Sequence, residues 1–367
     1  MLKQILKFIS GIIVIALAIY GGIYAWFQIK AVEDIHQTDI YEAVPANPSM
    51  MLIVHKPELL PEVWNVCCKF SNFLPEEKSL TVVNAIAKSQ ICSEQCIDKE
   101  PLAISYYPEG TLLFSRMKLK DFEYLEKKFF KANLSGFAPK KEVYKEAEIN
   151  IKATNDESFF CYTLYHNIFI GSFEKKLIYK AIDAYARQSC LKNDSTFKET
   201  IVSFDKFDKN SLAGLYLNEP QKYLIFRELN SDTLNRWLTG DIKFKDQILE
   251  ISGFVPANEQ DTLSVDSISS SSPCMEDSVK YENDIIRLRN KETVEDYLTS
   301  VKEENAFDQN PVFQAVFNDH YDNDVHEIIW IRKEFAWEEK PVFYNFLLFV
   351  SPNHTDKFYS LSIVREP

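Results

Sequence analysis

The residues best suited to chemistry lie in one acidic run, DHYDNDVHE, at positions 319–327. Four potential metal ligands alternate along it: His320, Asp322, Asp324 and His326. In an extended chain these side chains would share one face and could offer imidazole and carboxylate groups to a divalent cation. An EF-hand is excluded, because Glu327 stands where its loop needs glycine and Lys333 where it needs a bidentate glutamate. A solvated turn ahead of a strand is the favoured interpretation, since Asp-Asn-Asp is common turn chemistry.

The rest of the sequence contains no established catalytic motif. GxSxG, GxxxxGK[ST] and GxGxxG are absent, and the pair His326-Glu327 continues without the second histidine of HExxH. Carboxylate pairs such as Asp205 and Asp208 would suit a glycosidase, but 54 acidic residues make neighbouring acids inevitable. We therefore predict no catalytic, cofactor-binding or metal-binding residue, with the run at 319–327 left open.

The cysteines offer redox chemistry with more than one interpretation. There are seven: Cys67, Cys68, Cys92, Cys96, Cys161, Cys190 and Cys274. An odd number cannot all pair within one chain. In an oxidising compartment Cys92 and Cys96 could pair with each other or with Cys67 or Cys68. Cys161 lies in an apolar strand pattern that favours a buried thiol. Zinc is disfavoured, because no CxxC spacing is present.

The segment from Phe8 to Ile29 carries no charged residue and predicts a transmembrane helix. As a helix it would extend ~33 Å, enough to cross a hydrocarbon core of ~30 Å. Lys3 and Lys7 precede the segment, so the positive-inside rule places the N-terminus in the cytoplasm and the remainder in the periplasm or another extracytoplasmic space. A cleaved signal peptide is the alternative, but the apolar run is too long for one and lacks small residues at its end.

The composition excludes some classes of protein. Hydrophobic residues make up 46% of the chain and charged residues 26%, which excludes a mostly disordered chain. The chain has a net charge of -13, and because residues 1–30 contain three lysines and no acid, residues 31–367 have a net charge of -16. Such a surface repels phosphate backbones and anionic head groups, so we expect no nucleic-acid partner and disfavour anionic partners in general.

The hydrophobic periodicity predicts hairpins that alternate with single helices. Strands are expected at 50–54, 101–107, 111–118, 142–152, 158–165, 168–171, 212–217, 237–244 and 247–255, and helices at 59–73, 76–88, 119–133, 174–189 and 196–207. This order predicts an α+β fold in which an antiparallel sheet carries packed helices, preceded by the N-terminal transmembrane helix.

Composition also predicts the domain boundaries. Residues 1–30 form the cytoplasmic tip and transmembrane anchor, and 31–255 form the α+β ectodomain. Residues 256–280 are rich in serine and acids and predict a linker or long loop. Residues 281–367 are expected to form a smaller β-rich domain, with a helix at 293–302 and a meander of strands at 325–335, 341–350 and 357–364.

The layout of the chain resembles that of a known group of proteins. An anchor is followed by Val-Pro-Ala-Asn at 44–47, a buried strand, and alternating hairpins and helices that end in LAGLYLNEP at 212–220. This order is similar to uncharacterised membrane-anchored envelope proteins of Bacteroidetes-type bacteria that carry a domain of unknown function. The resemblance implies a single-pass protein of the cell envelope and no known activity.

A short pattern is similar to the O-glycan acceptor sequence of such bacteria. It consists of Asp, then Ser or Thr, then an aliphatic residue or Thr, at 194–196, 232–234, 261–263, 266–268 and 277–279. Ordinary linker composition explains the three copies in the serine-rich segment equally well.

These observations predict a single-pass envelope protein whose ectodomain acts as a non-catalytic binding, scaffold or envelope-assembly component. Its partners would be the membrane, through the N-terminal helix, and an envelope protein or glycan. The alternative is a membrane-tethered extracytoplasmic hydrolase that uses carboxylates or a metal.

Overall fold

The computed structural model describes most of the predicted ectodomain and short pieces elsewhere. The described residues are 17, 19–23, 39–60, 77–92, 102–155, 157–203, 207–219, 237–245, 248–256, 285–289, 327–337, 340–352 and 356–365.

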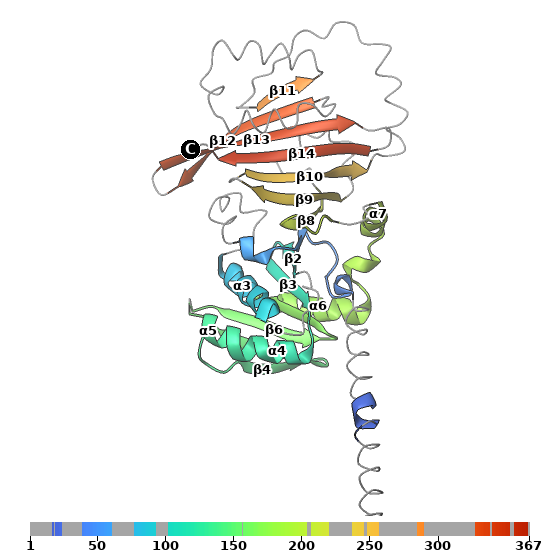
Figure 1. Ribbon diagram of the computed structural model, residues 1–367, viewed down its shortest axis with the longest axis vertical. Helices are drawn as coiled ribbons and strands as arrows, with labels where there is room; N and C mark the ends of the chain where they lie inside the picture. The colour runs from blue at the N-terminus through green and yellow to red at the C-terminus, as the bar shows by residue number, and fades with distance from the viewer. Residues whose placement is uncertain are drawn as a thin grey trace, which may run out of the picture.

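A single antiparallel sheet organises the molecule (Figure 1). Its 14 strands follow the order β11-β12-β13-β14-β10-β9-β8-β1-β2-β3-β7-β6-β5-β4. The strands are β1 (Met50–Val54), β2 (Leu102–Tyr107), β3 (Gly110–Arg116), β4 (Lys140–Tyr144), β5 (Ala147–Ala153), β6 (Phe159–Tyr165), β7 (Ile168–Ser172), β8 (Ala213–Leu217), β9 (Leu238–Lys245), β10 (Ile248–Pro256), β11 (Ile285–Arg289), β12 (Glu327–Trp337), β13 (Lys340–Pro352) and β14 (Asp356–Arg365).

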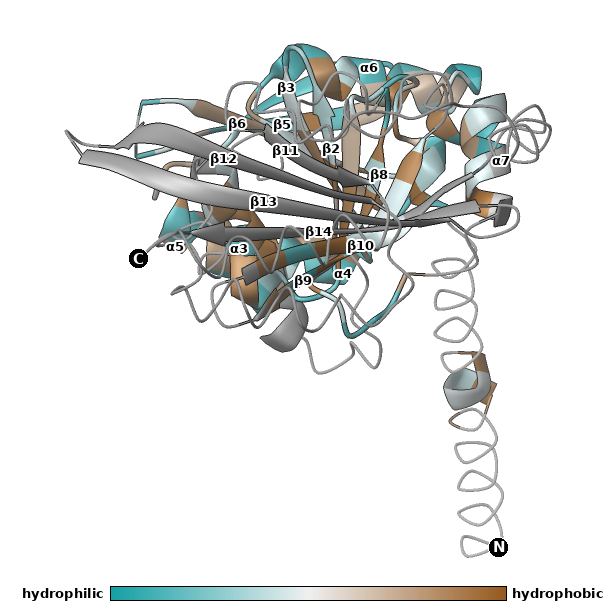
Figure 2. Cartoon of the chain, turned by 90° about the horizontal axis from the view of Figure 1, so that it is seen from above, coloured by the Kyte–Doolittle hydropathy of each residue, from teal (hydrophilic) through white to brown (hydrophobic). Residues whose placement is uncertain are grey.

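Helices cover both faces of the sheet, as the view in Figure 2 shows. The first face carries α3 (Glu77–Cys92), α4 (Leu119–Tyr124), the π-helix η4 (Leu125–Phe130) and α5 (Lys131–Asn133), with the short 3-10 helix η2 (Pro57–Leu59) beside α3. The second face carries α6 (Lys175–Arg187) and α7 (Ser195–Ser203), together with the 3-10 helices η1 (Ile40–Glu42) and η5 (Leu191–Asn193).

The central strand β1 shows why its sequence, MMLIV, lacks the alternation of a half-exposed strand. Met50, Leu52 and Val54 enter the core on the first face. Met51 and Ile53 point the opposite way and enter the core on the second face. A strand that is covered on both sides needs apolar residues at every position, which is what this run supplies.

Aromatic side chains fill the first-face core near β6. The ring of Phe130 from η4 lies 4.9 Å from that of Tyr162, 5.8 Å from Phe160 and 6.2 Å from Phe169, measured between centroids. All four side chains are buried. The edge-to-face geometry of the two closest pairs is the arrangement that aromatic quadrupoles favour.

The structure confirms the predicted α+β class with an antiparallel sheet and packed helices. The hairpin of β6 and β7 turns at His166 and Asn167, whose φ angles are 49° and 61°. Two consecutive left-handed residues fit a two-residue hairpin, because their backbone twist matches that of the flanking strands. The predicted strands of the C-terminal meander correspond to β12, β13 and β14, while β11 is a strand that the periodicity does not predict.

The single strand predicted at 142–152 is wrong. The segment forms two strands, β4 and β5, that turn at Lys145 and Glu146. Lys145 has a φ of 52°, so the chain reverses at a residue whose type does not signal a turn. Alternation of apolar and polar residues continues through both strands, and the pattern therefore resembles one longer strand.

The sheet runs through the predicted boundary between the two ectodomain parts. β10, before the serine-rich segment, pairs with β14 over nine residue positions, from Ile248–Val364 to Pro256–Asp356. The division into domains stays a prediction. The serine-rich segment 256–280 beyond Pro256 and the predicted helix at 293–302 lie outside the described residues, as does the predicted helix at 59–73 beyond its first two residues.

Most of the predicted transmembrane segment lies outside the described residues. Within the part of the chain that the structure describes, no helix is both long and apolar enough to span a membrane. Leu17 and residues 19–23 are helical. Their large apolar side chains are 51% to 70% exposed: Leu17, Ile19, Tyr20 and Ile23.

Replacing Phe130 with alanine is expected to lower the free energy of unfolding by about 3–5 kcal/mol, because the cavity would open inside the aromatic core. Phe137→Ala is the matched control, since that side chain is 77% exposed and its loss should change stability by less than about 0.5 kcal/mol. Urea unfolding of the full chain in detergent micelles measures both values. Equal losses for the two variants would contradict this account of the core.

Candidate functional site

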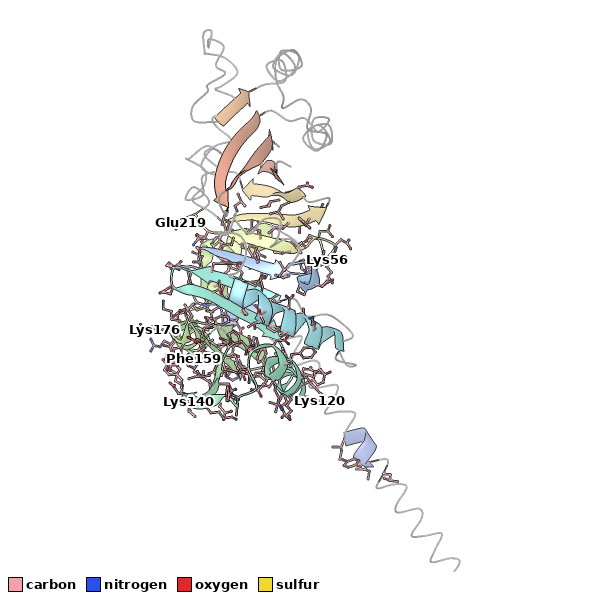
Figure 3. All side chains as sticks on the ribbon, turned by 90° about the vertical axis from the view of Figure 1, so that its left-hand side faces the viewer. Lys56, Lys120, Lys140, Phe159, Lys176 and Glu219 are labelled. Carbon is pink, nitrogen blue, oxygen red and sulfur yellow. The ribbon has the colours of Figure 1, made fainter. Side chains whose placement is uncertain are left out.

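One end of the sheet differs from the rest of the molecule in charge and in exposed apolar area. We call residues 118–145, which comprise α4, η4, α5 and the edge strand β4 with their connections, the β4 end. It contains eight lysines and four acidic residues, a net charge of +4 in a chain of net charge -13. Figure 3 shows Lys120 and Lys140 at this end of the molecule.

The exposed apolar side chains concentrate in the same region. From residue 39 onward, every large hydrophobic side chain that is exposed among the described side chains lies between 119 and 159. Four of them belong to the β4 end: Leu119 (62% exposed), Tyr124 (36%), Phe137 (77%) and Val143 (73%). The fifth, Phe159 (58%), begins β6. A concentration of exposed apolar groups is typical of an interaction site.

The π-helix η4 determines which side chains of this segment face the core. Leu125 and Phe130 are five residues apart and both fully buried. In an α-helix such residues point about 140° apart, since each residue advances the helix by about 100°. The wider π turn, with bonds from i to i+5, brings them to one face. The intervening lysines, Lys127 and Lys128, are left on the exposed side.

A buried lysine supports the loop that carries Phe137. Lys152 in β5 is only 4% exposed, and its Nζ donates a hydrogen bond to the carbonyl oxygen of Phe137 at 2.7 Å. Burial lowers the pKa of Lys152, although the negative charge of Glu126 opposes this shift. The loop backbone is thus attached to the sheet while the ring of Phe137 projects into solvent.

Other polar groups lie beneath the same helical segment. The Tyr162 hydroxyl donates to Oε1 of Glu126 at 2.8 Å, and burial raises the pKa of Tyr162. Asn150, on β5 opposite Tyr162, is 3% exposed, and its Oδ1 finds no hydrogen-bond partner among the described residues; the same holds for Oγ of Ser135. The hydrogen bond between Tyr162 and Glu126 joins β6 to η4 beneath the exposed surface.

Contacts with α6 hold the edge strand from the second face. Glu142 accepts hydrogen bonds from Lys175 at 3.1 Å and from the Tyr179 hydroxyl, and these two donors hold the pKa of Glu142 below its usual value. The ring of Tyr144 stacks on that of Tyr179 with centroids 4.2 Å apart. β4 is therefore a fixed edge, and its lysines also discourage pairing with a further strand.

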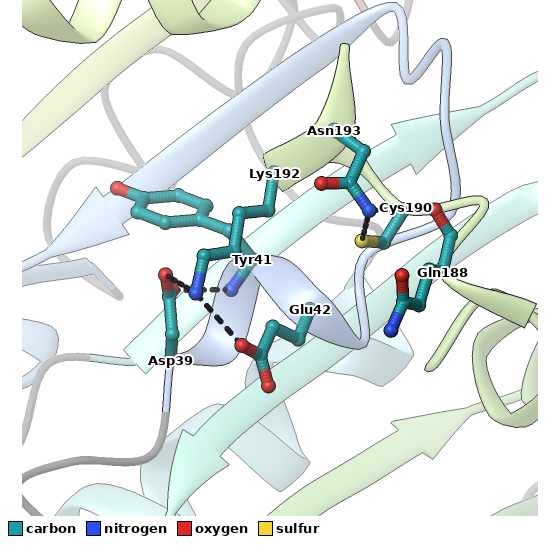
Figure 4. A network of polar contacts seen from close by, with 7 residues as sticks. All are labelled: Asp39, Tyr41, Glu42, Gln188, Cys190, Lys192 and Asn193. Carbon is teal, nitrogen blue, oxygen red and sulfur yellow. Dashed lines mark hydrogen bonds and ion pairs between the residues drawn. The ribbon is translucent and has the colours of Figure 1, made fainter. Parts of the chain in front are cut away.

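The chain enters the folded body at a second polar cluster, drawn in Figure 4. Lys192 in η5 forms ion pairs with Glu42 at 2.7 Å and Asp39 at 3.3 Å. The hydrogen bond that Lys192 donates to Glu42 is the main reason why the pKa of Lys192 is raised. The backbone N–H of Leu191 donates to the carbonyl oxygen of Val44 at 2.8 Å. Residues 39–44, which follow the predicted anchor, are thus attached to the second-face helices.

The cysteines that the structure describes with their side chains are buried thiols. Cys161 and Cys190 are both free. Burial raises the pKa of Cys161 to about 11, which keeps it protonated and unreactive at neutral pH. The prediction of a buried thiol for Cys161 is confirmed. The disulfide pairings predicted around Cys96 and residues 67–68 lie outside the described residues, as does Cys274.

The predicted metal-binding run also lies outside the described residues, which resume at Glu327 where β12 begins. This applies to all four potential ligands: His320, Asp322, Asp324 and His326. Among the residues that are described, no group of three or more His, Cys, Asp or Glu side chains could hold a metal ion.

Asp194, the first residue of one candidate glycan acceptor pattern, has a structural role. Its Oδ1 accepts hydrogen bonds from the Phe197 N–H at 2.9 Å and from the Thr196 hydroxyl at 2.6 Å. This is the N-cap geometry that begins a helix, here α7. Ser195 and Thr196 are exposed. The other four copies of the pattern lie outside the described residues.

Sequence reasoning did not single out two titratable groups near β8. Asp241 in β9 accepts a hydrogen bond from the Asp208 N–H at 3.0 Å, and burial raises its pKa. Burial also lowers the pKa of His55, whose Nε2 has no partner among the described residues. Asp241 lies in β9, whose sequence LTGDIKFK alternates polar and apolar residues, so the sequence alone suggests an exposed side chain. The pairing of β9 with β8 places Asp241 beside the loop at 207–211, where it is partly buried. Asp205, the predicted partner of Asp208, lies outside the described residues.

The variant Asp241→Asn tests the effect of this buried acid on stability. A folded-state pKa above the unfolded value means that wild-type stability decreases as pH rises through the folded pKa, because the charged form is desolvated. Asparagine keeps the acceptor for the Asp208 N–H and cannot ionise, so the variant should gain stability relative to wild type between about pH 4 and pH 7. Urea unfolding of the full chain at several pH values measures this difference. Glu146→Gln, an exposed change, is the control, and parallel curves for wild type and Asp241→Asn would contradict the expectation.

Comparisons with known proteins do not show a family for this chain. No protein-family model and no curated protein matches the sequence. Among solved structures, the chain is similar to "Structure of crystal form I of TP0453", at 9% sequence identity and a TM-score of 0.33. The match covers 63% of this chain and 86% of that one. At this TM-score the similarity supports no conclusion about fold or function.

Proposed function

We propose that this chain is a single-pass envelope protein whose extracytoplasmic part is a non-catalytic binding or scaffold component that docks its partner at the β4 end. The observation that carries the proposal is the concentration of exposed apolar side chains at that end, on a surface that is basic in an otherwise acidic chain. An anchored protein with an exposed apolar surface of this kind is suited to hold another envelope component near the membrane.

The charge-free segment from Phe8 to Ile29 supports the anchor. Its described part is helical and exposes its apolar side chains, which would face lipid in a membrane-spanning helix. The lysines before the segment favour a cytoplasmic N-terminus and an ectodomain on the opposite side of the membrane. The envelope location that the family resemblance implies is in agreement with this orientation.

The polar contacts around the β4 end support a binding role for it. Lys152 attaches the Phe137 loop to β5, and Glu142 attaches β4 to α6. A surface that is already ordered loses little conformational entropy when a partner binds. The ring of Phe137 and the side chain of Val143 therefore stand exposed on a rigid support, as expected of a docking surface. An envelope protein, a glycan or the membrane surface itself is a candidate partner.

Membrane fractionation tests the anchor. The full chain should remain with membranes after extraction with alkaline carbonate, and a C-terminal tag should be accessible to protease added outside the cytoplasmic membrane. The double variant Leu17→Arg, Ile19→Arg should be released, because each arginine near the centre of a span costs about 2.5–3.5 kcal/mol in insertion. Leu17→Phe, Ile19→Phe is the apolar control. Release of the unmodified chain, or a protected C-terminal tag, would disprove the anchored topology.

Site-specific photo-crosslinking tests the docking surface. Benzoylphenylalanine in place of Phe137 or Val143 should form adducts in native membranes, since both positions point outward from the β4 end. Substitutions at Lys198 and Lys209, which are exposed on α7 and in the loop before β8, are the controls and should form few adducts. The same adduct yield at all four positions would show that the β4 end is not a preferred contact.

A further inference from the structure

We propose that the β4 end rests on the anionic head groups of the membrane that the chain's own N-terminal segment spans. This inference depends on the anchored topology proposed above and names the partner of the docking surface. Two features of the described residues support it, unpaired lysines and the apolar side chains beside them, and the number of residues between the predicted anchor and Asp39 supplies a third.

The charge of the β4 end complements an anionic lipid surface. Lys120, Lys128 and Lys131 are exposed on α4, η4 and α5, and no ion pair joins them to another described residue. The acidic remainder of the ectodomain does not cancel their effect, because charges more than about 8 Å away are largely screened at physiological ionic strength. Local charge therefore decides which surface this end attracts. Lys141 and Lys145 are neutralised by Glu148 and Asp183, which lie outside residues 118–145, so the local positive charge rests on Lys120, Lys128 and Lys131.

The apolar side chains lie among these lysines. Leu119 precedes Lys120, and Tyr124 follows in the same helical segment, with 62% and 36% of their surfaces exposed. Phe137 adds an exposed ring from the loop that follows α5. Lysines with aromatic and leucine side chains beside them are typical of surfaces that lie in the head-group region, where rings insert and ammonium groups meet phosphates.

The connection to the anchor restricts where the ectodomain can lie. Residues 24–38 separate the last helical residue of the predicted span that the structure describes, at position 23, from Asp39, and a fully extended chain of that length would reach only about 50 Å. The ion pairs of Lys192 attach Asp39 and Glu42 to the folded body, so this body cannot drift further from the lipid. In Figure 1 the helical residues 19–23 lie beyond the end of the molecule that carries β4 and α4, and β12 to β14 lie at the opposite end.

The test uses the full chain in lipid nanodiscs with benzoylphenylalanine in place of Phe137. One set of discs contains neutral phosphatidylcholine, and the other also contains phosphatidylglycerol. Co-elution with the discs is measured first, and mass spectrometry then measures the yield of lipid adducts after illumination. We expect the yield in anionic discs to exceed that in neutral discs by at least about threefold and to fall towards the neutral value in 1 M salt, as the screening length shrinks to about 3 Å.

A charge-reversal variant isolates the contribution of the lysines. Lys120→Glu, Lys128→Glu, Lys131→Glu should reduce the adduct yield in anionic discs to that in neutral discs. The matched control reverses three exposed lysines elsewhere, Lys198→Glu, Lys209→Glu and Lys243→Glu, and should keep the wild-type yield. Thermal unfolding shows whether each variant folds, and the salt dependence of the unmodified surface tests the proposal without any charge variant.

Each outcome bears on the proposal. Equal lipid yields in the two kinds of disc, or an unchanged yield in the lysine variant, would overturn it. Adducts of the mass of two chains would also overturn it, in favour of a second copy of this chain as the occupant. Failure of the chain to enter the discs would disprove the anchor, whereas entry without lipid adducts would disprove only the head-group contact.

Discussion

The fold depends on the burial of its central strands on both faces. β1 sends alternate side chains into two separate cores, one beneath α3 and the η4 segment and the other beneath α6 and α7. This arrangement needs an apolar residue at every position of the strand and a helix layer on each side. Its neighbours β2 and β8, and β3 beyond β2, share this double cover, so the centre of the sheet is the most completely buried part of the described molecule.

The same constraint explains why the docking surface lies at an edge. Cover by helices decreases from the centre of the sheet towards β4, where all five positions are exposed or only half-buried. An edge strand cannot bury both of its faces, and here α6 covers one of them through Glu142 and Tyr144. Val143 is left in solvent because it points to the other face, away from these contacts. The exposed apolar residues are thus a product of the sheet's end and of the lysine-rich helices beside it.

The β4 end differs in charge from the rest of the molecule, and the net charge of the chain does not show this difference. A chain with a net charge of -13 contains a segment, residues 118–145, with eight lysines and four acids, and charges further than a screening length contribute little to what its unpaired lysines attract. At long range the net charge of the ectodomain disfavours both nucleic acid and anionic head groups as partners. The choice of partner at the β4 end concerns local charge and exposed rings. The two conclusions are compatible because they apply at different distances.

Much of the architecture follows from local sequence. The apolar run at 50–54, the His166-Asn167 turn and the helical spacing of Leu177, Ile178, Ala181 and Ile182 predict β1, the β6–β7 hairpin and α6, because each signal is carried by neighbouring residues. The α+β class follows from their order.

The division of 142–152 into β4 and β5 does not follow, since it depends on a left-handed lysine. The pairing of β10 with β14 does not follow either, since its partners lie 100 or more positions apart. The candidate site depends on tertiary structure most of all. In a chain with 46% hydrophobic residues, Phe130 and Phe137 are indistinguishable by type, and only packing against β6 decides that one fills the core while the other meets solvent.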